Sequence, residues 1–519
     1  MQVIENKALM FVTRKHEQIS ALVPKSKVLE TQGDKGRMLV KWGLDEWQIL
    51  RNLGIKDVPH PIWGAYTWPG IYDPFDHQRV TAAFLASHPR CYCFNEAGTG
   101  KTSASAWAAD YLMLQGKIKR VLIVCPVSIM DTAWRSDLFK TAMHRSVGIA
   151  MGTRKQREAV VEARYDFTII NFDGVKVVQA ALAKADYDLI IVDEANYVKT
   201  TTSDRWKALA SLVKPNTRVW AMTGTPASQS PMDAYGLAKL VAPASVPRFA
   251  GAWKDKVMRK VTQYKWVVRD TAAALVHQTL QPAVRFTKEE CLDLPDLLYA
   301  TRVAPLTAQQ QKYYDAIKKN MMAMAAGEEI TAVNAASLLN KLLQVGQGAV
   351  YTDTREVVQF DVKPRLTELL TIIDSTPRKV LVFIPYRHVL EMLTEAVSSH
   401  LGDPNMVEVI HGGVGASQRA EIIKRFQTED SPRVLLMIPQ ATAHGITLTR
   451  ADQVVWWGPV SSTETYLQAN SRAHRAGQTH SVTVTHLQGS PVEKRAYTML
   501  QNNVDLHTNI VELFKEEIS

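Results

Sequence analysis

Short runs of consecutive apolar, largely β-branched residues alternate with amphipathic segments of helical length, and this rhythm occurs twice along the 519-residue chain. The first series of runs is 91–94, 121–125, 168–171, 189–192 and 219–222. The second series is 380–384, 407–410, 434–437, 454–457 and 482–487. Strands that are apolar on both faces are typical of parallel sheets covered by helices on both sides. The sequence therefore predicts an α/β fold with two parallel-sheet lobes.

Three further segments lie outside these lobes. Residues 1–70 mix short β-like runs with a helical patch before prolines and glycines interrupt the pattern, so we expect a small N-terminal α+β accessory module. Residues 246–362 have a largely helical pattern, which predicts helical insertions and a linker between the lobes. The predicted domains are 1–70, 71–245 (first lobe), 246–362, 363–495 (second lobe) and 496–519 (a C-terminal helical tail).

Composition places the chain among folded globular proteins, with 46% hydrophobic and 22% charged residues. This excludes a mostly disordered chain and a disulfide-stapled miniprotein. The four cysteines form no C-x-x-C pair, which disfavours a zinc site and favours a reducing cytoplasm. No apolar run approaches the ~18 residues of a membrane span, and the first residues lack the apolar core of a signal peptide. We therefore expect a cytoplasmic protein with no membrane contact.

A candidate phosphate-binding loop, Phe-Asn-Glu-Ala-Gly-Thr-Gly-Lys-Thr at residues 94–102, follows one predicted strand and begins a predicted helix. Its backbone N–H groups, freed by the glycines, can surround phosphate oxygens. Lys101 can neutralise the β- and γ-phosphates, and the Thr102 hydroxyl can bind Mg²⁺. Asn95 stands where the general G-x-x-x-x-G-K-[ST] pattern has its first glycine. The alternative is an ordinary glycine turn before a helix.

Two carboxylates, Asp193 and Glu194, follow the apolar run 189–192. Open α/β sheets bind ligands at the carboxyl ends of their strands. One carboxylate there can hold Mg²⁺ while its neighbour orients the attacking water. A solvated strand end or a helix N-cap is the alternative.

Three further segments carry a resemblance. Residues 221–226 read Ala-Met-Thr-Gly-Thr-Pro, residues 466–478 contain Gln-Ala-x-x-Arg-x-x-Arg-x-Gly-Gln, and residues 121–134 contain Cys-Pro and a tryptophan. In this order and at these spacings, the chain resembles the Swi/Snf-type helicase-like ATPases of superfamily 2 over about residues 73–490. Its compact layout is most similar to virus-encoded or prokaryotic members. That family's phosphate loop has the form x-E-x-G-x-G-K-T, which fits Asn95.

The resemblance implies two RecA-like lobes with ATP and Mg²⁺ bound between them, the first lobe being the ATP-binding one. The implied catalytic residues are Lys101, Asp193, Glu194, Arg472 and Arg475, the two arginines acting as fingers from the second lobe. The implied nucleotide contacts are Gln78 at the adenine, Gly98, Thr99, Gly100, Lys101 and Thr102 at the phosphates, and Gln468. The implied metal ligands are Thr102 and Asp193. Taken alone, the i, i+3 spacing of Arg472 and Arg475 equally fits one solvated helix face.

Two positions and one stretch depart from the family pattern. Asn196 stands where many relatives have His or Gln, and Gly458 stands where many have Asp. The stretch 441–448 replaces a glycine-rich segment, so only Gly445 and Leu448 carry over. None of these changes removes a charge that catalysis requires.

Contacts to nucleic acid should be mainly to phosphates, because a motor must hold DNA without reading its sequence. The net charge of +10 agrees with such a polyanionic partner. The candidate contacts are Ser128, Trp134, Asn171, Thr223, Thr225, His411, Gly412, Thr442 and His444. A basic stretch from Lys254 to Lys265 with neighbouring tryptophans could follow duplex DNA, although a solvated helix face explains it nearly as well. We expect the tryptophans of residues 1–70 to pack in a core.

These observations predict a DNA-dependent ATPase that moves along double-stranded DNA and remodels forked or branched DNA or protein–DNA complexes in replication, recombination or repair. The partner is DNA, double-stranded or forked, and a protein partner would use the N-terminal module. One alternative is a strand-separating DNA or RNA helicase. The other is a nucleic-acid-binding scaffold whose ATPase is degenerate.

Overall fold

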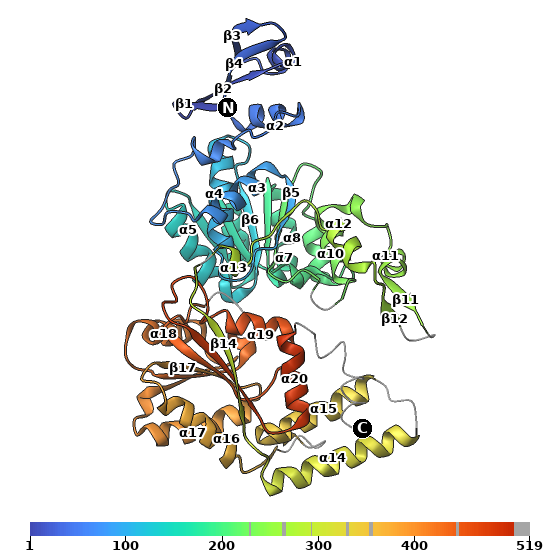
Figure 1. Ribbon diagram of the computed structural model, residues 1–519, viewed down its shortest axis with the longest axis vertical. Coiled ribbons are helices and arrows are strands. Elements are labelled where there is room, and N and C mark those ends of the chain that lie inside the picture. The colour runs from blue at the N-terminus through green and yellow to red at the C-terminus, as the bar shows by residue number, and fades with distance from the viewer. Residues whose placement is uncertain are drawn as a thin grey trace. The chain divides into compact units, whose positions relative to one another are not determined.

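A computed structural model describes residues 1–227, 230–261, 266–291, 293–327, 332–351, 357–442 and 446–502. The chain divides into two compact units, Met1–Thr287 and Lys288–Ser519. Each unit contains a parallel sheet with helices packed on it (Figure 1). The prediction of two α/β parallel-sheet lobes is therefore confirmed.

The sheet of unit 1 has seven strands in the order β13-β5-β10-β9-β6-β8-β7, and every neighbouring pair is parallel. The strands are β5 (Arg90–Cys93), β6 (Val121–Cys125), β7 (Val147–Ala150), β8 (Phe167–Asn171), β9 (Leu189–Asp193), β10 (Arg218–Met222) and β13 (Ala283–Val284). In β9, Ile190 and Val192 enter one hydrophobic core while Leu189 and Ile191 enter the other. Burial on both faces explains why the central strands read as unbroken apolar runs.

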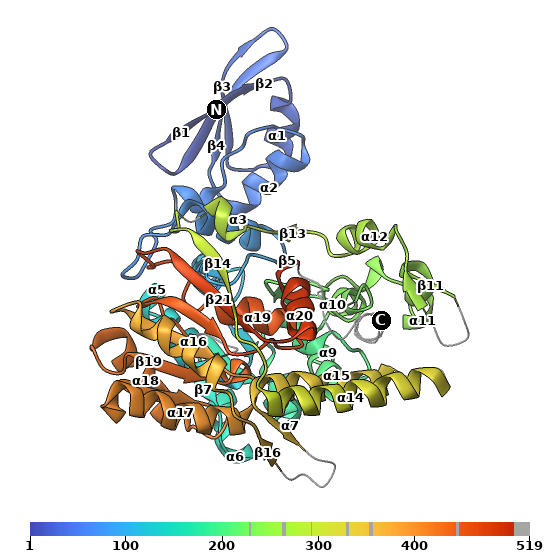
Figure 2. The ribbon, with the colours of Figure 1, turned by 60° about the horizontal axis from the view of Figure 1, so that its bottom comes forward.

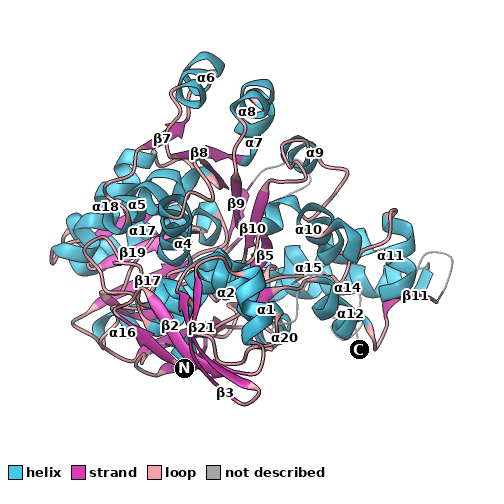
Figure 3. Ribbon diagram, turned by 90° about the horizontal axis from the view of Figure 1, so that it is seen from above, coloured by secondary structure: helices cyan, strands magenta, loops and turns pink. Residues whose placement is uncertain are grey.

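Helices cover both faces of this sheet (Figure 3). They are α3 (Asp76–Ser87), α4 (Lys101–Leu114), α5 (Ser136–Thr141), α6 (Arg154–Glu162), α7 (Phe172–Val177), α8 (Gln179–Ala185), α9 (Asp204–Ala210), α10 (Asp233–Val241), α11 (Ala250–Val257) and α12 (Ala272–Thr279). Between α11 and α12 lies an antiparallel hairpin of β11 (Met258–Lys260) and β12 (Trp266–Val268). This hairpin lies at the opposite end of unit 1 from β7 (Figure 3).

The N-terminal module is a four-stranded antiparallel sheet in the order β1-β2-β4-β3 with two helices, as predicted for an α+β module. Its elements are β1 (Gln2–Ile4), β2 (Ala8–Thr13), α1 (His16–Leu22), β3 (Ser26–Gln32), β4 (Lys35–Lys41) and α2 (Leu44–Asn52). Trp42 and Trp47 are buried and donate their indole N–H groups to the carbonyls of Pro59 and Val58, so these two tryptophans do pack in the core. Trp63, in contrast, is 51% exposed.

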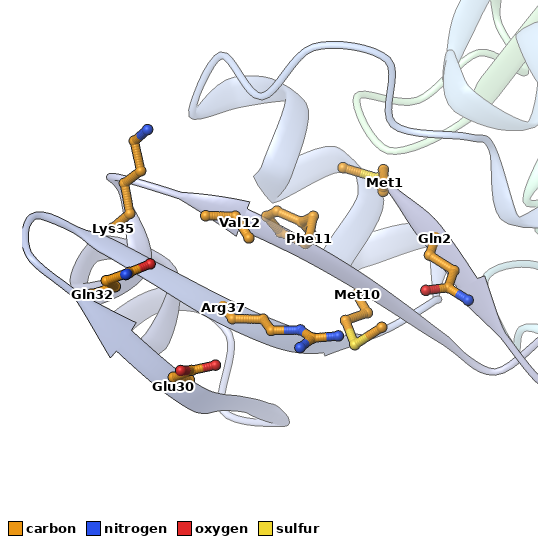
Figure 4. Close-up of a pocket in the computed structure, with 9 residues that line it drawn as sticks. All are labelled: Met1, Gln2, Met10, Phe11, Val12, Glu30, Gln32, Lys35 and Arg37. Carbon is orange, nitrogen blue, oxygen red and sulfur yellow. The ribbon is translucent and has the colours of Figure 1, made fainter.

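One face of this small sheet stays open to solvent. A shallow pocket of about 540 Å³ hollows it, with Met10, Val12, Glu30 and Arg37 among its lining residues (Figure 4). The mixture of apolar and charged side chains shows that this face is not packed as a core.

The sheet of unit 2 has six parallel strands in the order β14-β21-β20-β17-β19-β18. The strands are β14 (Leu297–Val303), β17 (Lys379–Phe383), β18 (Val407–Ile410), β19 (Val434–Met437), β20 (Ala451–Trp456) and β21 (Val482–Gln488). The helices are α13 (Lys288–Cys291), α14 (Ala308–Gly327), α15 (Ala332–Gln347), α16 (Lys363–Asp374), α17 (Arg387–Leu401), α18 (Ala416–Thr428), α19 (Thr463–Asn470) and α20 (Pro491–Gln501). A short hairpin of β15 (Ala349–Tyr351) and β16 (Val357–Gln359) follows α15, and α14 and α15 lie side by side (Figure 2).

The segment 246–362 is more than a helical insertion. Besides α14 and α15 it supplies β13 to the first sheet and β14 to the second. Both strands lie at sheet edges, and the side chains of β14 are largely exposed. An edge strand therefore lacks the unbroken apolar run that marks the central strands. Of the predicted tail 496–519, α20 extends to Gln501, and residues 503–519 lie outside the described residues.

The four cysteines are free thiols, three of them buried. Among the described residues, no helix is both long and apolar enough to cross a membrane.

Candidate nucleotide site and strand contacts

The predicted site residues of unit 1 meet at one edge of its sheet. Four adjacent strands, in the order β5-β10-β9-β6, have parallel directions, so their carboxyl ends lie together. The phosphate loop follows β5, the Thr223–Thr225 segment follows β10, Asp193 ends β9, and the segment leading to Trp134 follows β6. This edge is where open α/β sheets bind their ligands.

The phosphate loop turns through two glycines in the left-handed region, Gly98 at φ +92° and Gly100 at φ +79°. A Cβ atom at Gly100 would lie 2.0 Å from Nε2 of Gln78, so no other residue fits there without displacing Gln78. Helix α4 begins directly afterwards at Lys101. Its unpaired N-terminal N–H groups and the turned loop form the kind of cradle that binds phosphate.

Two side chains of helix α3 are hydrogen-bonded to this loop. His77 Nε2 donates to the carbonyl of Thr99 at 2.8 Å, and Gln78 Nε2 donates to the same carbonyl at 3.4 Å. Gln78 is buried against the loop. Its contact with adenine therefore stays a prediction, and its observed contact is with the phosphate loop.

Lys101 is held within its own loop. Its Nζ donates to the carbonyl oxygens of Asn95 at 2.8 Å and Glu96 at 3.2 Å. Thr102 lies in the first turn of α4 and is partly exposed. The ammonium group and this hydroxyl are thus next to the cradle, as an ATP·Mg²⁺ site requires.

Asn95 makes structural contacts beside the site that the sequence did not reveal. Its side chain is 1% exposed; its Oδ1 accepts from the backbone N–H of Phe286 at 3.0 Å, and its Nδ2 donates to Thr81 Oγ1 at 2.9 Å. Asn95 therefore joins the end of β5 to α3 and to the chain that follows β13. The only signal in the sequence was a polar residue in the place of a glycine.

The carboxylates lie at the end of β9. Asp193 Oδ1 accepts from the backbone N–H of Glu194 at 3.0 Å, and Asp193 Oδ2 accepts from Nε1 of Trp134 at 2.9 Å. Burial raises the pKa of Asp193, while the positive charge of Lys101 and these two hydrogen bonds oppose that rise. Glu194 has a φ of +53°, a strained value for a residue with a side chain. Strain of this kind is concentrated at functional sites.

These residues fit ATP and Mg²⁺. Within the described part of the chain, no group of three or more His, Cys, Asp and Glu residues could hold a metal ion. Mg²⁺ is commonly bound by one or two protein oxygens together with substrate phosphates. Thr102 and Asp193 would supply those oxygens beside the cradle.

The segment after β10 is linked to both parts of this site. A Cβ atom at Gly224 would lie 3.4 Å from the backbone nitrogen of Ala97 in the phosphate loop. Nδ2 of Asn196, two residues after Glu194, donates to the carbonyl of Thr225 at 3.0 Å and to its hydroxyl at 3.2 Å. Asn196 therefore connects the acidic segment to Thr225, although it departs from the family pattern.

In unit 2, Arg472 and Arg475 lie beyond the end of α19 at Asn470. The interpretation of one solvated helix face is therefore wrong. Arg472 is buried, and Arg475 Nη1 donates to the carbonyl of Ile446 at 3.1 Å. Gln468 lies in α19 and donates to Glu464 at 3.2 Å. The catalytic roles of the two arginines and of Gln468 stay predictions.

Three of the candidate DNA contacts need correction because their side chains are buried. Trp134 is 0% exposed and bound to Asp193, Thr223 is fully buried, and Asn171 accepts from Arg157 Nη1 at 2.9 Å. A side chain enclosed in this way cannot touch a passing strand.

The remaining candidates differ in exposure. Ser128, Thr225 and His411 are partly exposed, and Gly412 is exposed. Thr442 ends a turn at Pro439–Thr442, and His444 lies outside the described residues. Ser128, Thr225, His411 and Gly412 therefore keep their predicted role as contacts.

Comparison with known protein families decides the classification. Residues 9–349 match the SNF2-related domain, and residues 362–477 match the helicase conserved C-terminal domain. The chain belongs to the SNF2 family. It is thus a Swi/Snf-type, helicase-like ATPase of superfamily 2, as the resemblance implied.

This SNF2 chain is similar to an uncharacterised ATP-dependent helicase of Mycoplasma genitalium, with 26% identity over 79% of this chain and 39% of the relative. It is also similar to the SWI/SNF-related matrix-associated actin-dependent regulator of chromatin subfamily A-like protein 1 of Xenopus tropicalis, with 25% identity over 80% of this chain and 42% of the relative. The chain spans about two fifths of the length of these relatives. A solved SWI2/SNF2 ATPase core from Sulfolobus solfataricus, in complex with double-stranded DNA, matches with a TM-score of 0.43 and 20% identity over 87% of this chain and 97% of that one.

Proposed function

We propose that this SNF2 chain is an ATP-driven translocase on double-stranded DNA. The observation that carries the proposal is the meeting of the phosphate loop, the two carboxylates and the Thr223–Thr225 segment at one sheet edge, where Asn196 joins two of them directly. A site that only bound nucleotide would not need a segment that joins its carboxylates to a partly exposed threonine.

The residues would divide the work of ATP hydrolysis as follows. Thr102 and Asp193 would hold Mg²⁺, which when bound would supply positive charge that neutralises the phosphates. Lys101 would exchange the carbonyls of Asn95 and Glu96 for phosphate oxygens. Glu194 would orient the attacking water and accept its proton, while Arg472 and Arg475 would stabilise charge on the transferred phosphoryl group. The products are ADP and inorganic phosphate.

DNA contacts would come from partly exposed loop ends and from basic side chains. Lys254 lies over the ring of Trp266 at 4.0 Å, so the hairpin β11–β12 is fastened to α11 by a cation–π contact. Arg259 and Lys260 in β11 are exposed, while Lys265 lies outside the described residues. A strand that carries exposed cations suits sequence-independent contact with a phosphate backbone.

The finer assignments form part of the same proposal. We expect a cytoplasmic motor that remodels forked or branched DNA or protein–DNA complexes in replication, recombination or repair, in a bacterial cell or one infected by a virus. A protein partner would bind the N-terminal module.

The decisive experiment measures steady-state ATP hydrolysis without nucleic acid and with single-stranded DNA, blunt duplex, forked DNA and RNA. The proposal expects the largest stimulation with duplex or forked DNA, and displacement of a third strand from a blunt duplex. Lys101→Ala should abolish hydrolysis, whereas Lys117→Ala, which removes only a surface ion pair with Asp45, should not.

Two other outcomes would favour the alternatives. Unwinding of a tailed duplex without triplex displacement would indicate a strand-separating helicase. DNA binding without stimulated phosphate release would indicate a scaffold.

A further inference from the structure

Trp134 makes a hydrogen bond that sets it apart from the other buried tryptophans of unit 1. Its indole N–H donates to a carboxylate oxygen, Oδ2 of Asp193, at 2.9 Å. Trp107, Trp220 and Trp253 are also buried, but they donate to the backbone carbonyls of Pro69, His88 and Pro231. The indole N–H of Trp134 is therefore paired with a side chain of the candidate site instead of with a backbone carbonyl.

The backbone that carries Trp134 has an unusual conformation. After β6 the chain makes a 3₁₀ turn at Val127–Ile129 and then a π-helical turn at Met130–Arg135. Single π-helical turns are rare and often occur at functional sites. Thr132 Oγ1 donates to the carbonyl of Ser128 at 2.7 Å, which joins the two turns. The proposed strand contact Ser128 and the buried Trp134 thus belong to one short segment.

We propose that Trp134 is a positioning residue through which the segment 127–135 controls the orientation of Asp193. This inference rests on the proposed function, because it takes Asp193 as the Mg²⁺ ligand and Ser128 as a DNA contact. The second oxygen of Asp193 is held by the backbone N–H of Glu194, so the carboxylate is fixed from two sides. A bound DNA strand that moved the 127–135 segment would shift the hydrogen bond from Trp134 to Asp193. The hydrogen bond from Glu194 to Asp193 would stay in place.

The physical reason is the short range of a hydrogen bond. An N–H···O bond weakens steeply once the heavy atoms separate beyond about 3.2 Å or the angle falls. The indole ring is rigid and fully enclosed, so it transmits a displacement of its backbone without absorbing it by rotation. DNA contact at Ser128 would therefore change the orientation of the Asp193 carboxylate, which is the proposed Mg²⁺ ligand.

The test compares Trp134→Phe with Trp220→Phe. Each removes one indole N–H from a fully buried ring, but only the first N–H contacts Asp193. The first readout is the stimulation of ATP hydrolysis by blunt duplex. The second is binding of a fluorescent ADP analogue with Mg²⁺ and with EDTA, which needs neither DNA nor turnover.

We expect Trp134→Phe to reduce the stimulation of ATP hydrolysis by DNA at least about tenfold. The factor by which Mg²⁺ strengthens ADP binding should fall by at least about the same amount. The reason is that one charge-assisted hydrogen bond typically contributes ~1.5–3 kcal/mol. Trp220→Phe should stay within about twofold of wild type in both. Equal behaviour of the two variants would overturn the proposal. If wild type shows no DNA stimulation, the proposed function fails, and the Mg²⁺-dependent ADP binding still decides whether Trp134 positions Asp193.

Hydrogen exchange in the wild-type protein avoids any dependence on the folding of the variants. Peptides that cover residues 127–138 should gain protection with Mg²⁺ and ADP but not with ADP and EDTA. Peptides that cover β10 should respond equally to both conditions. No difference at residues 127–138 would contradict the coupling.

Discussion

Asn95→Gly would give the phosphate loop the glycine of the general pattern, and a comparison of sequences alone would expect it to be neutral or beneficial. The structure predicts the reverse. Asn95 is almost fully buried, and both ends of its amide are hydrogen-bonded, to Phe286 N–H and to Thr81 Oγ1. Glycine removes both bonds and leaves a buried N–H without its acceptor.

The expected cost follows from these two bonds. An unsatisfied N–H costs about 1–3 kcal/mol and a lost neutral hydrogen bond about 1 kcal/mol. The added backbone freedom of glycine costs roughly 0.5–1 kcal/mol. The total is about 3 kcal/mol, which for a unit of this size corresponds to a fall in Tm of roughly 6–12 °C. The affinity for ADP should fall several-fold, because the backbone carbonyl of Asn95 also holds Lys101.

Urea denaturation and thermal melting measure the stability, and titration with a fluorescent ADP analogue measures the site. Thr81→Val is the matched control, since it removes the other partner of one of the two bonds. The double variant should cost less than the sum of the single ones, because both share that bond. An Asn95→Gly protein that melts at or above the wild-type temperature and binds nucleotide more tightly would refute this reasoning.

Three further outcomes are expected. Arg475→Ala should lower kcat by about 10³-fold or more while ATP binding changes only a few-fold, since an arginine finger acts on the transition state; a loss of binding at normal kcat would contradict that role. Glu493→Gln should destabilise unit 2 by about 3–5 kcal/mol in chemical denaturation, because it leaves buried Arg365 without the carboxylate at 2.7 Å. Burial lowers the pKa of His486 to about 4, below its ordinary value of 6.5. Between these two pH values the unfolded chain therefore binds one more proton than the folded chain. The free energy of unfolding should fall by roughly 3 kcal/mol as the pH drops from 6.5 to 4. His486→Gln should flatten that slope in denaturation curves measured from pH 7 to 4.

The central strands could be predicted from the sequence because both of their faces are buried. All five residues of β9 are buried, and its first four form one apolar run that ends directly before Asp193, which located the acidic segment. β14 could not be predicted in this way, because at the sheet edge its side chains are largely exposed and its pattern is no longer continuous. Long-range pairing along the chain, such as β13 beside β5, leaves no local signal at all.

At the site, residue type and spacing located the charged groups but not the groups that hold them. The sequence placed Lys101, Asp193 and Glu194 after strands, whereas the partner of Asp193 lies 59 residues earlier. Tryptophan is equally suited to a DNA surface and to a core, because its ring is apolar and its N–H is polar. Only the fold distinguishes these roles, and it assigns Trp134 to the interior.

Asn95, which departs from the general phosphate-loop pattern, and Asn196 and Gly458, which depart from the family pattern, bear on whether the ATPase is degenerate. Asn95 is hydrogen-bonded at both ends of its amide, and Asn196 holds Thr225. At Gly458 a Cβ atom would lie 2.0 Å from Cδ of Gln347, so the buried side chain of Gln347 fills the space that a larger residue would need. A site that had lost its function would be free to lose such pairings, since nothing would maintain them. That all three positions have a fitted partner, while the lysine, the two carboxylates and the two arginines are present, argues against a degenerate ATPase.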